Sequence, residues 1–202
     1  MFVQVIQGKT SNVDQLRAAV DTWSRDLAPG AAGWLGSTGG VTDDGRFIVL
    51  VRFESEDAAR RNSDRPEQDR WWAETARLFD GDATFHDSTD ATADLSGDPD
   101  QAGFVQVIQG RSSDPGRANE LMSEDSDTRA AFRPEILGTL AVNYDNGGYT
   151  VAIYFTSEAE AREGERKEPP PEFVAQMEEI NRLNIGEPEF FDLRQLWLHS
   201  PS

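Results

Sequence analysis

The stretch "FVQVIQG" occurs twice in this 202-residue chain, at residues 2–8 and at residues 104–110, which are 102 positions apart. The same offset joins "LGST" at 35–38 to "LGTL" at 137–140. A period near 100 is much longer than a solenoid repeat and equals the length of a whole small domain. The sequence therefore predicts two related domains in tandem.

A later pair of matches shows where the repeats differ in length. "GDATFHD" at 81–87 and "GEPEFFD" at 186–192 are 105 positions apart, so three residues are inserted in the second repeat. The proline-rich segment "KEPPPE" is the expected place of this insertion. We predict a first repeat at residues 1–88, a linker at 89–102 and a second repeat at 103–202.

Each repeat reads as strand, helix, strand, strand, helix, strand. In the first repeat, "FVQVIQG" is rich in β-branched residues, and apolar residues then recur at helical spacing through 11–27. Two further strands flank the turn "TDDG", and a second helix, interrupted at Pro66, leads to the closing strand "ATFHDST". This order predicts an α+β fold built from ferredoxin-like βαββαβ units.

The central strands predict how the repeats are arranged. "FIVLV" at 47–51 and "YTVAIYF" at 149–155 are apolar at successive positions rather than at alternate ones. Such runs are typical of strands that are buried on both faces. Helices would cover one face, so we expect the two sheets to stack on each other about a pseudo-twofold axis.

The composition narrows the classes of function. A net charge of −18 disfavours nucleic acid and anionic lipid as partners. The chain has no cysteine and only two histidines, which excludes thiolate metal sites and multi-histidine metal sites. Carboxylate-rich metal sites remain possible, but no spacing of the acidic residues supports one, so we expect no metal and no cofactor. No apolar run approaches the roughly 20 residues of a membrane helix, and the chain begins directly with a strand. We expect a cytoplasmic protein without membrane contact.

The order of elements, the duplication and the phrase "VRFESEDAARRNSDRPEQDRWWAETARLF" resemble the dimeric α+β barrel superfamily. The resemblance is greatest to its antibiotic-biosynthesis-monooxygenase-like branch, here in a fused, tandem form. It implies an intramolecular barrel, either as a monomer or as a homodimer of such chains. It also implies one of two activities that members of the group have. The first is the oxygenation of polycyclic phenols without a cofactor, and the second is the degradation of haem. Gln7 and Gln109 stand where the haem-degrading members carry an asparagine, so haem does not fit this chain.

Two polar residues are candidates for catalysis because the matching position of the other repeat carries a residue of a different type. His86 matches Phe191, and an imidazole can act as a general base near neutral pH; the alternative is a strand histidine bonded to backbone or water. Arg52 interrupts the apolar run of its strand and could hold a substrate anion. Its alternative is an ion pair with an acid such as Asp87.

Aromatic residues are candidates for the walls of a binding site. Adjacent Trp71 and Trp72 cannot face the same way on a helix, and helical spacing places Trp72 in the core and Trp71 at a cleft or on the surface. Trp34 is a second candidate wall, although it also fits a core position. Tyr154, the match of Arg52, is the candidate in the second repeat. We expect one working pocket, in the first repeat.

Three functions remain open from the sequence. The first is a cofactor-independent monooxygenase acting on an aromatic or polyphenolic small molecule. The second is a non-catalytic small-molecule-binding or stress-related barrel protein. The third is a structural module that offers its surface to a protein partner. A pocket shared by the candidate residues would favour the first, and a closed core would favour the third.

Overall fold

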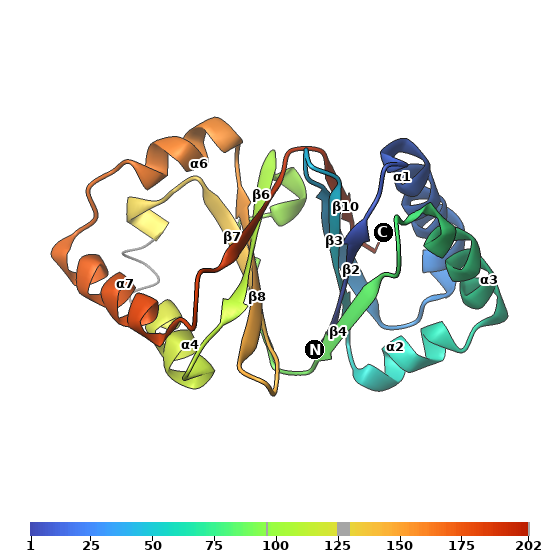
Figure 1. The fold of residues 1–202 in the computed structure, drawn as a ribbon, viewed down its shortest axis with the longest axis horizontal. Coiled ribbons are helices and arrows are strands. Elements are labelled where there is room, and N and C mark those ends of the chain that lie inside the picture. Colours follow the sequence, from blue (N-terminus) through green and yellow to red (C-terminus); the bar gives the residue numbers. More distant parts are fainter. Residues whose placement is uncertain (96, 125–129, 202) are drawn as a thin grey trace. The chain divides into compact units, whose positions relative to one another are not determined.

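The computed structural model describes residues 1–95, 97–124 and 130–201. These residues form two compact units, residues 1–91 with 193–202 and residues 92–192. Each unit contains a five-stranded antiparallel sheet with its helices on one face (Figure 1). The predicted α+β class and the βαββαβ order of each repeat are confirmed.

The first unit follows the predicted order closely. Its sheet has the strand order β10-β2-β3-β1-β4. The strands are β1 (Phe2–Lys9), β2 (Trp34–Val41), β3 (Arg46–Phe53), β4 (Thr84–Ser88) and β10 (Leu196–His199), and the helices are α1 (Val13–Thr22), α2 (Glu56–Ser63) and α3 (Pro66–Thr75). A π-helical turn, Trp23–Leu27, continues α1.

The second unit repeats this plan with the strand order β5-β7-β8-β6-β9. The strands are β5 (Ala91–Asp94), β6 (Phe104–Arg111), β7 (Ile136–Asn143), β8 (Gly148–Phe155) and β9 (Glu189–Leu193), and the helices are α4 (Pro115–Ser123), α6 (Glu158–Glu165) and α7 (Pro171–Leu183). The insertion "KEPPPE" ends at the start of α7, where Pro171 takes the first helical position.

An edge strand of each sheet comes from the end of the other repeat. β5 follows β4 along the chain but pairs beside β7, and β10 follows β9 but pairs with β2. The segment 89–102, predicted as a linker, therefore contains a strand, and it also contains a short 3₁₀ turn, Pro99–Gln101. The sequence pattern did not indicate this exchange.

Local signals explain why both repeats fold alike. Ser55 and Ser157 cap α2 and α6, since their hydroxyls accept hydrogen bonds from the N–H groups of Ala58 and Glu160. In both hairpins the turn ends in a glycine with positive φ, Gly45 at 81° and Gly147 at 79°. These matched caps and turns bear out the alignment of the two repeats.

The two faces of the first sheet differ in what they carry. Alternate residues of β3, Phe47, Val49, Val51 and Phe53, face the helices and belong to or pack against the two aromatic core clusters of the unit. The residues between them, Ile48 and Leu50, lie on the opposite face with Val3 and Val5 of β1. The prediction that a second sheet stacks on this face rests on that apolar pattern and stays a prediction.

Candidate functional site

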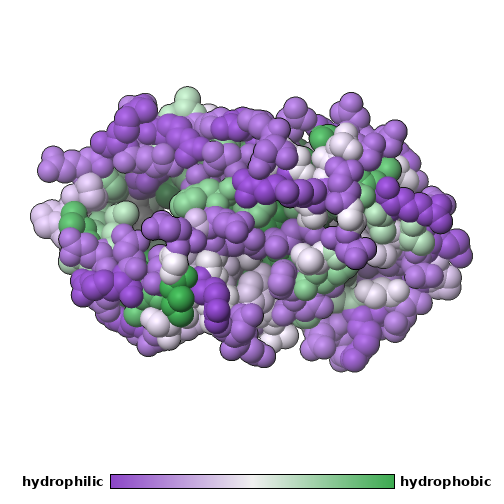
Figure 2. All heavy atoms as spheres, in the orientation of Figure 1, coloured by the Kyte–Doolittle hydropathy of each residue, from purple (hydrophilic) through white to green (hydrophobic). Residues whose placement is uncertain are grey.

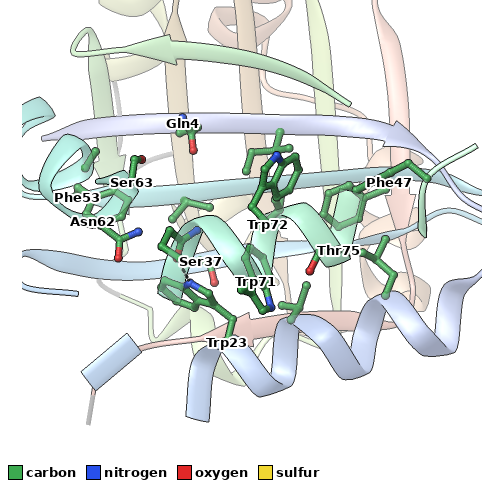
Figure 3. A pocket seen from close by; sticks show the side chains of 18 residues that line it. Gln4, Trp23, Ser37, Phe47, Phe53, Asn62, Ser63, Trp71, Trp72 and Thr75 are labelled. Atoms are coloured by element: carbon green, nitrogen blue, oxygen red, sulfur yellow. Dashed lines mark hydrogen bonds between the residues drawn. The ribbon is translucent and has the colours of Figure 1, made fainter. Parts of the chain in front are cut away.

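A cavity of about 80 Å³ lies in the first unit, between the helix-facing side of its sheet and the helices (Figure 3). Its polar lining consists of amides and hydroxyls: Gln4, Ser37, Asn62, Ser63, Gln68 and Thr75. Its aromatic lining consists of Trp23, Phe47, Phe53, Trp71, Trp72 and Phe79. None of the lining side chains is ionisable, so the cavity is aromatic and polar but uncharged.

The aromatic lining forms a connected series of rings. Trp23 lies 6.3 Å from Trp71, which lies 6.1 Å from Trp72, and Trp72 lies 6.2 Å from Phe79, all measured between ring centroids. Phe47 meets Phe79 edge-on at 5.3 Å. These tilted and edge-on contacts are the arrangements that aromatic rings prefer, and they leave ring faces and edges available to an aromatic ligand.

Two indole nitrogens hold their rings in place. The Nε1 of Trp23 donates to the Oε1 of Gln68 at 2.5 Å, and the Nε1 of Trp71 donates to the backbone oxygen of Ala19 at 2.9 Å. The first bond joins the π-helical turn that follows α1 to α3, and the second bond joins α1 itself to α3. The aromatic wall is therefore tied to two helical segments at defined orientations.

One transverse row of the sheet crosses the floor of the cavity. The strand registers align five residues on the helix-facing side, in the order His199, Ser37, Val51, Gln4 and Asp87, from β10 to β4. The three middle residues line the cavity. An imidazole therefore stands at one end of this row and a carboxylate at the other.

Both ends of the row are engaged by hydrogen bonds. At one end, the Nε2 of Gln4 donates to the Oδ1 of Asp87 at 3.0 Å. At the other, the Nε2 of His199 lies 3.2 Å from the Oδ1 of Asp21 on α1. The Nδ1 of His199 is buried without a hydrogen-bond partner among the described residues. Because a carboxylate only accepts, Nε2 carries the proton of the neutral ring and Nδ1 keeps its lone pair.

The structure brings two of the predicted binding residues to this site. Trp71 lines the cavity, as expected for a cleft residue. Trp34 is buried in the adjoining core and packs edge-on against Trp23 at 5.2 Å, so it supports the wall without lining the cavity. The prediction that Trp72 is a core residue holds in part, because Trp72 packs against a core cluster of the unit but is only half-buried. It also lines the cavity, with Phe85 against its ring at 5.1 Å.

The other predicted residues lie elsewhere. Arg52 pairs with Val3 and His86 pairs with Val5, which places both on the face of the sheet opposite the cavity. Asp87 faces the cavity side, so it does not meet Arg52, whose Nε has no hydrogen-bond partner among the described residues. Tyr154 belongs to the second unit and is buried there. The catalytic roles of Arg52 and His86 stay predictions, and the cavity does not involve them.

The second unit keeps the scaffold of this site but not its aromatic wall. The Nε2 of Gln176, the match of Trp71, donates to the backbone oxygen of Leu121, the match of Ala19. The Phe47–Phe79 contact is replaced by a hydrogen bond of 3.0 Å from the Tyr149 hydroxyl to the Oδ1 of Asn184. Partial burial raises the pKa of Tyr149. Tyr149 and Phe155 keep an aromatic ring at the positions of Phe47 and Phe53, whereas Gln176, Met177 and Asn184 stand in place of Trp71, Trp72 and Phe79.

Several residues of the site were not predicted from the sequence. Gln4, Ser37 and His199 are among them. The repeat itself held a usable signal for Gln4, because the same glutamine and the same aspartate recur in both copies as Gln106 and Asp192. No such signal exists for His199, since its place depends on the exchanged strand.

Within the described ranges, no group of three or more histidine, aspartate or glutamate side chains could hold a metal ion. In the same part of the chain, no helix is both long enough and apolar enough to span a membrane. The visible surface is mostly hydrophilic, in keeping with the strongly negative net charge (Figure 2).

Comparisons with known proteins agree with the architecture. No model of a protein family matches the sequence, and no curated protein matches it. Among solved structures, a proposed monooxygenase from Lactobacillus acidophilus NCFM has a TM-score of 0.76 and 11% identity, covering 98% of this chain and 95% of its own. A proposed monooxygenase from Fusobacterium nucleatum has a TM-score of 0.72 and 8% identity, covering 98% and 94%.

A third structure, an anthrone oxidase-like protein, has a TM-score of 0.63 and 9% identity, covering 98% of this chain and 93% of its own. At such identities the likeness shows the fold and leaves the activity open. The predicted resemblance is confirmed at the level of the fold, which the chain shares with these three structures over nearly its whole length.

Proposed function

We propose that the first unit binds an aromatic small molecule in its cavity and acts as a cofactor-independent monooxygenase on it. The observation that carries this proposal is the cavity itself, whose lining combines a connected series of aromatic rings with uncharged amides and hydroxyls. Apolar walls with a few placed polar groups are typical of small-molecule sites. The monooxygenase part is supported by the fold, which the chain shares with proposed monooxygenases.

The cavity must open before a ring can enter. Its volume of about 80 Å³ is smaller than the roughly 150 Å³ of a cavity that accommodates benzene. Trp71 and Trp72 are the half-buried members of the wall, and both lie on α3, which a short turn at Asp64 and Arg65 separates from α2. We infer that the indole of Trp72, which has no hydrogen bond among the described residues, moves aside when a ligand binds, whereas the bond to Ala19 holds that of Trp71.

Anthrone is a suitable probe of turnover, because a structure of the same fold is an anthrone oxidase-like protein. In this reaction the CH₂ carbon of anthrone loses two hydrogens and gains one oxygen atom of O₂ as a carbonyl, and the second oxygen atom leaves as water. The substrate supplies all the electrons, so no external reductant is required. The protein's part is to remove a proton and to hold the resulting anion.

In this proposal the proton acceptor is His199. Asp21 fixes the tautomer in which Nδ1 is unprotonated. A buried acceptor without a partner costs free energy, so the unpaired Nδ1 calls for a functional explanation. Ser37 lies directly opposite His199 in the strand register and lines the cavity, and in this proposal its hydroxyl turns to bond the Nδ1 of His199 and relays the proton when a ligand is present. A histidine oriented by a carboxylate is a common general base.

Oxygen uptake with anthrone tests the proposal and distinguishes the two histidines. We expect the His199→Asn variant to lose at least tenfold in kcat, while the His86→Asn variant stays close to the wild type. The opposite pattern would restore His86 as the base. Absence of anthraquinone formation above the uncatalysed rate with wild-type protein would contradict the monooxygenase function.

A second candidate, binding without turnover, is favoured by one observation. No ionisable side chain lines the cavity, so both the imidazole and the carboxylate stand beside it rather than in it. A protein of this kind would quench its tryptophan fluorescence on adding an aromatic ligand but would not accelerate oxygen uptake. The same two measurements therefore separate the candidates.

A further inference from the structure

The amide of Gln4 has a fixed orientation at the cavity floor. Its Nε2 donates to the carboxylate of Asp87, and a carboxylate can only accept, so the NH₂ group must face Asp87. The Oε1 atom has no hydrogen bond in the described part of the chain, and Figure 3 shows it directed toward the lining side chains. The floor therefore presents a free acceptor to the cavity.

The second unit keeps the same pair in a different electrostatic setting. Gln106 Nε2 donates to Asp192 Oδ1 at 2.9 Å, but Asp192 is also bonded by Arg162, whose guanidinium lies 5.3 Å above the ring of Phe104. Although partial burial lowers the pKa of Arg162, its pairing with Asp192 and Glu165 raises the pKa above its ordinary value. The carboxylate of this unit is thus neutralised by an ion pair.

In the first unit the matching arginine is directed elsewhere. Arg60 occupies the position of Arg162 but pairs with Asp57 on its own helix. Within the described residues Asp87 has no ion pair, and its hydrogen bond is to Gln4. A carboxylate that is not neutralised polarises the amide that it accepts from, which makes the Oε1 of Gln4 a better acceptor.

We propose that Gln4 accepts a hydrogen bond from a hydroxyl group of the aromatic ligand, with Asp87 as the residue that positions the amide. This inference rests on the proposed binding of an aromatic ligand in the same cavity and specifies its chemistry: a phenol or naphthol rather than an unsubstituted or etherified ring. Ser37 lies two strands away in the same row, about 10 Å at ordinary strand spacing. An aromatic skeleton between the two, such as the enol form of anthrone, which is a phenol, would place its hydroxyl at Gln4 and its reacting carbon toward Ser37 and His199.

The test compares 1-naphthol with 1-methoxynaphthalene, which keeps the ring but lacks the donor. Calorimetric titration of the full-length protein should give 1-naphthol about tenfold tighter binding, equivalent to 1.4 kcal/mol. The near-isosteric Gln4→Met variant should remove this preference by weakening 1-naphthol alone. The Asp87→Asn variant, changed at an exposed position, should reduce the preference because its amide no longer fixes the orientation of Gln4.

Gln106→Met is the matched control, because it makes the same change in the second unit and should leave the preference intact. If wild-type protein binds both compounds equally, the inference is overturned while the proposed aromatic binding stands. If Gln4→Met and Asp87→Asn both keep the tenfold preference, another acceptor binds the hydroxyl and the inference also fails. If neither compound binds, the proposed function fails and the inference fails with it.

Discussion

Replacing Trp71 by the residue at its matching position in the second unit tests both the alignment and the wall of the cavity. In Trp71→Gln, the new amide can donate to the backbone oxygen of Ala19, as the amide of Gln176 does to that of Leu121. In Trp71→Ala, this hydrogen bond is lost. The two variants therefore differ in one interaction while both remove the indole.

The structure sets the expected magnitudes. Truncating a fully buried tryptophan to alanine costs about 3–5 kcal/mol, so the half-buried Trp71 should cost about 2 kcal/mol for its packing. Loss of the hydrogen bond adds about 1 kcal/mol. In Trp71→Ala the backbone oxygen of Ala19 still has a hydrogen-bond partner, because it also accepts from the backbone N–H of Trp23. We expect Trp71→Ala to be destabilised by about 3 kcal/mol and Trp71→Gln by about 2 kcal/mol.

Urea denaturation followed by tryptophan fluorescence measures this difference. All five tryptophans lie in the first unit, so the signal reports on that unit alone: Trp23, Trp34, Trp71, Trp72 and Trp197. Equal destabilisation of the alanine and glutamine variants would refute the argument, since it would show that the bond to Ala19 does not hold α1 against α3.

Three further predictions concern the fold. Deleting residues 194–202 removes β10, with the buried Trp197, and leaves β2 as a bare edge, so the fluorescence-detected Tm should fall by several degrees; an unchanged Tm would contradict the contribution of the exchanged strand. A fragment of residues 1–88 should dimerise or aggregate in light scattering, and a well-behaved monomer would count against the predicted stacking of the sheets. Gly81→Ala should cost about 1–3 kcal/mol through backbone strain alone, because φ is 114° and no atom lies within 4 Å of the added Cβ; a neutral effect in denaturation would contradict this.

The duplicated motif was enough to predict the repeats, the order of their elements and the resemblance of the fold. It succeeded because strand composition, helical spacing and hairpin turns are local signals, and each appears twice. The comparison of matched positions also predicted that the repeats diverge at Trp71, and Gln176 indeed replaces its hydrogen bond but not its ring.

The site was harder to predict, because it depends on which face of a strand a residue occupies and on which strand lies beside it. Arg52 and His86 were singled out by contrast with the other repeat, but the register places them across the sheet from the cavity. His199 reaches the row of Gln4 only because β10 pairs with β2 of the first unit, a long-range pairing that no local pattern specifies. The hydrogen bond between Gln4 and Asp87 likewise joins residues 83 positions apart.

The most direct test of the proposed site is a calorimetric titration of 1-naphthol into the wild-type protein and the Trp72→Met variant. Methionine is the residue that the second unit carries at this position, Met177, where it is exposed. We predict one binding site per chain for the wild type, with quenching of the tryptophan fluorescence, and at least tenfold weaker binding for Trp72→Met. Two equal sites per chain, or an affinity that is unchanged by Trp72→Met, would contradict the assignment of the first-unit cavity as the functional site.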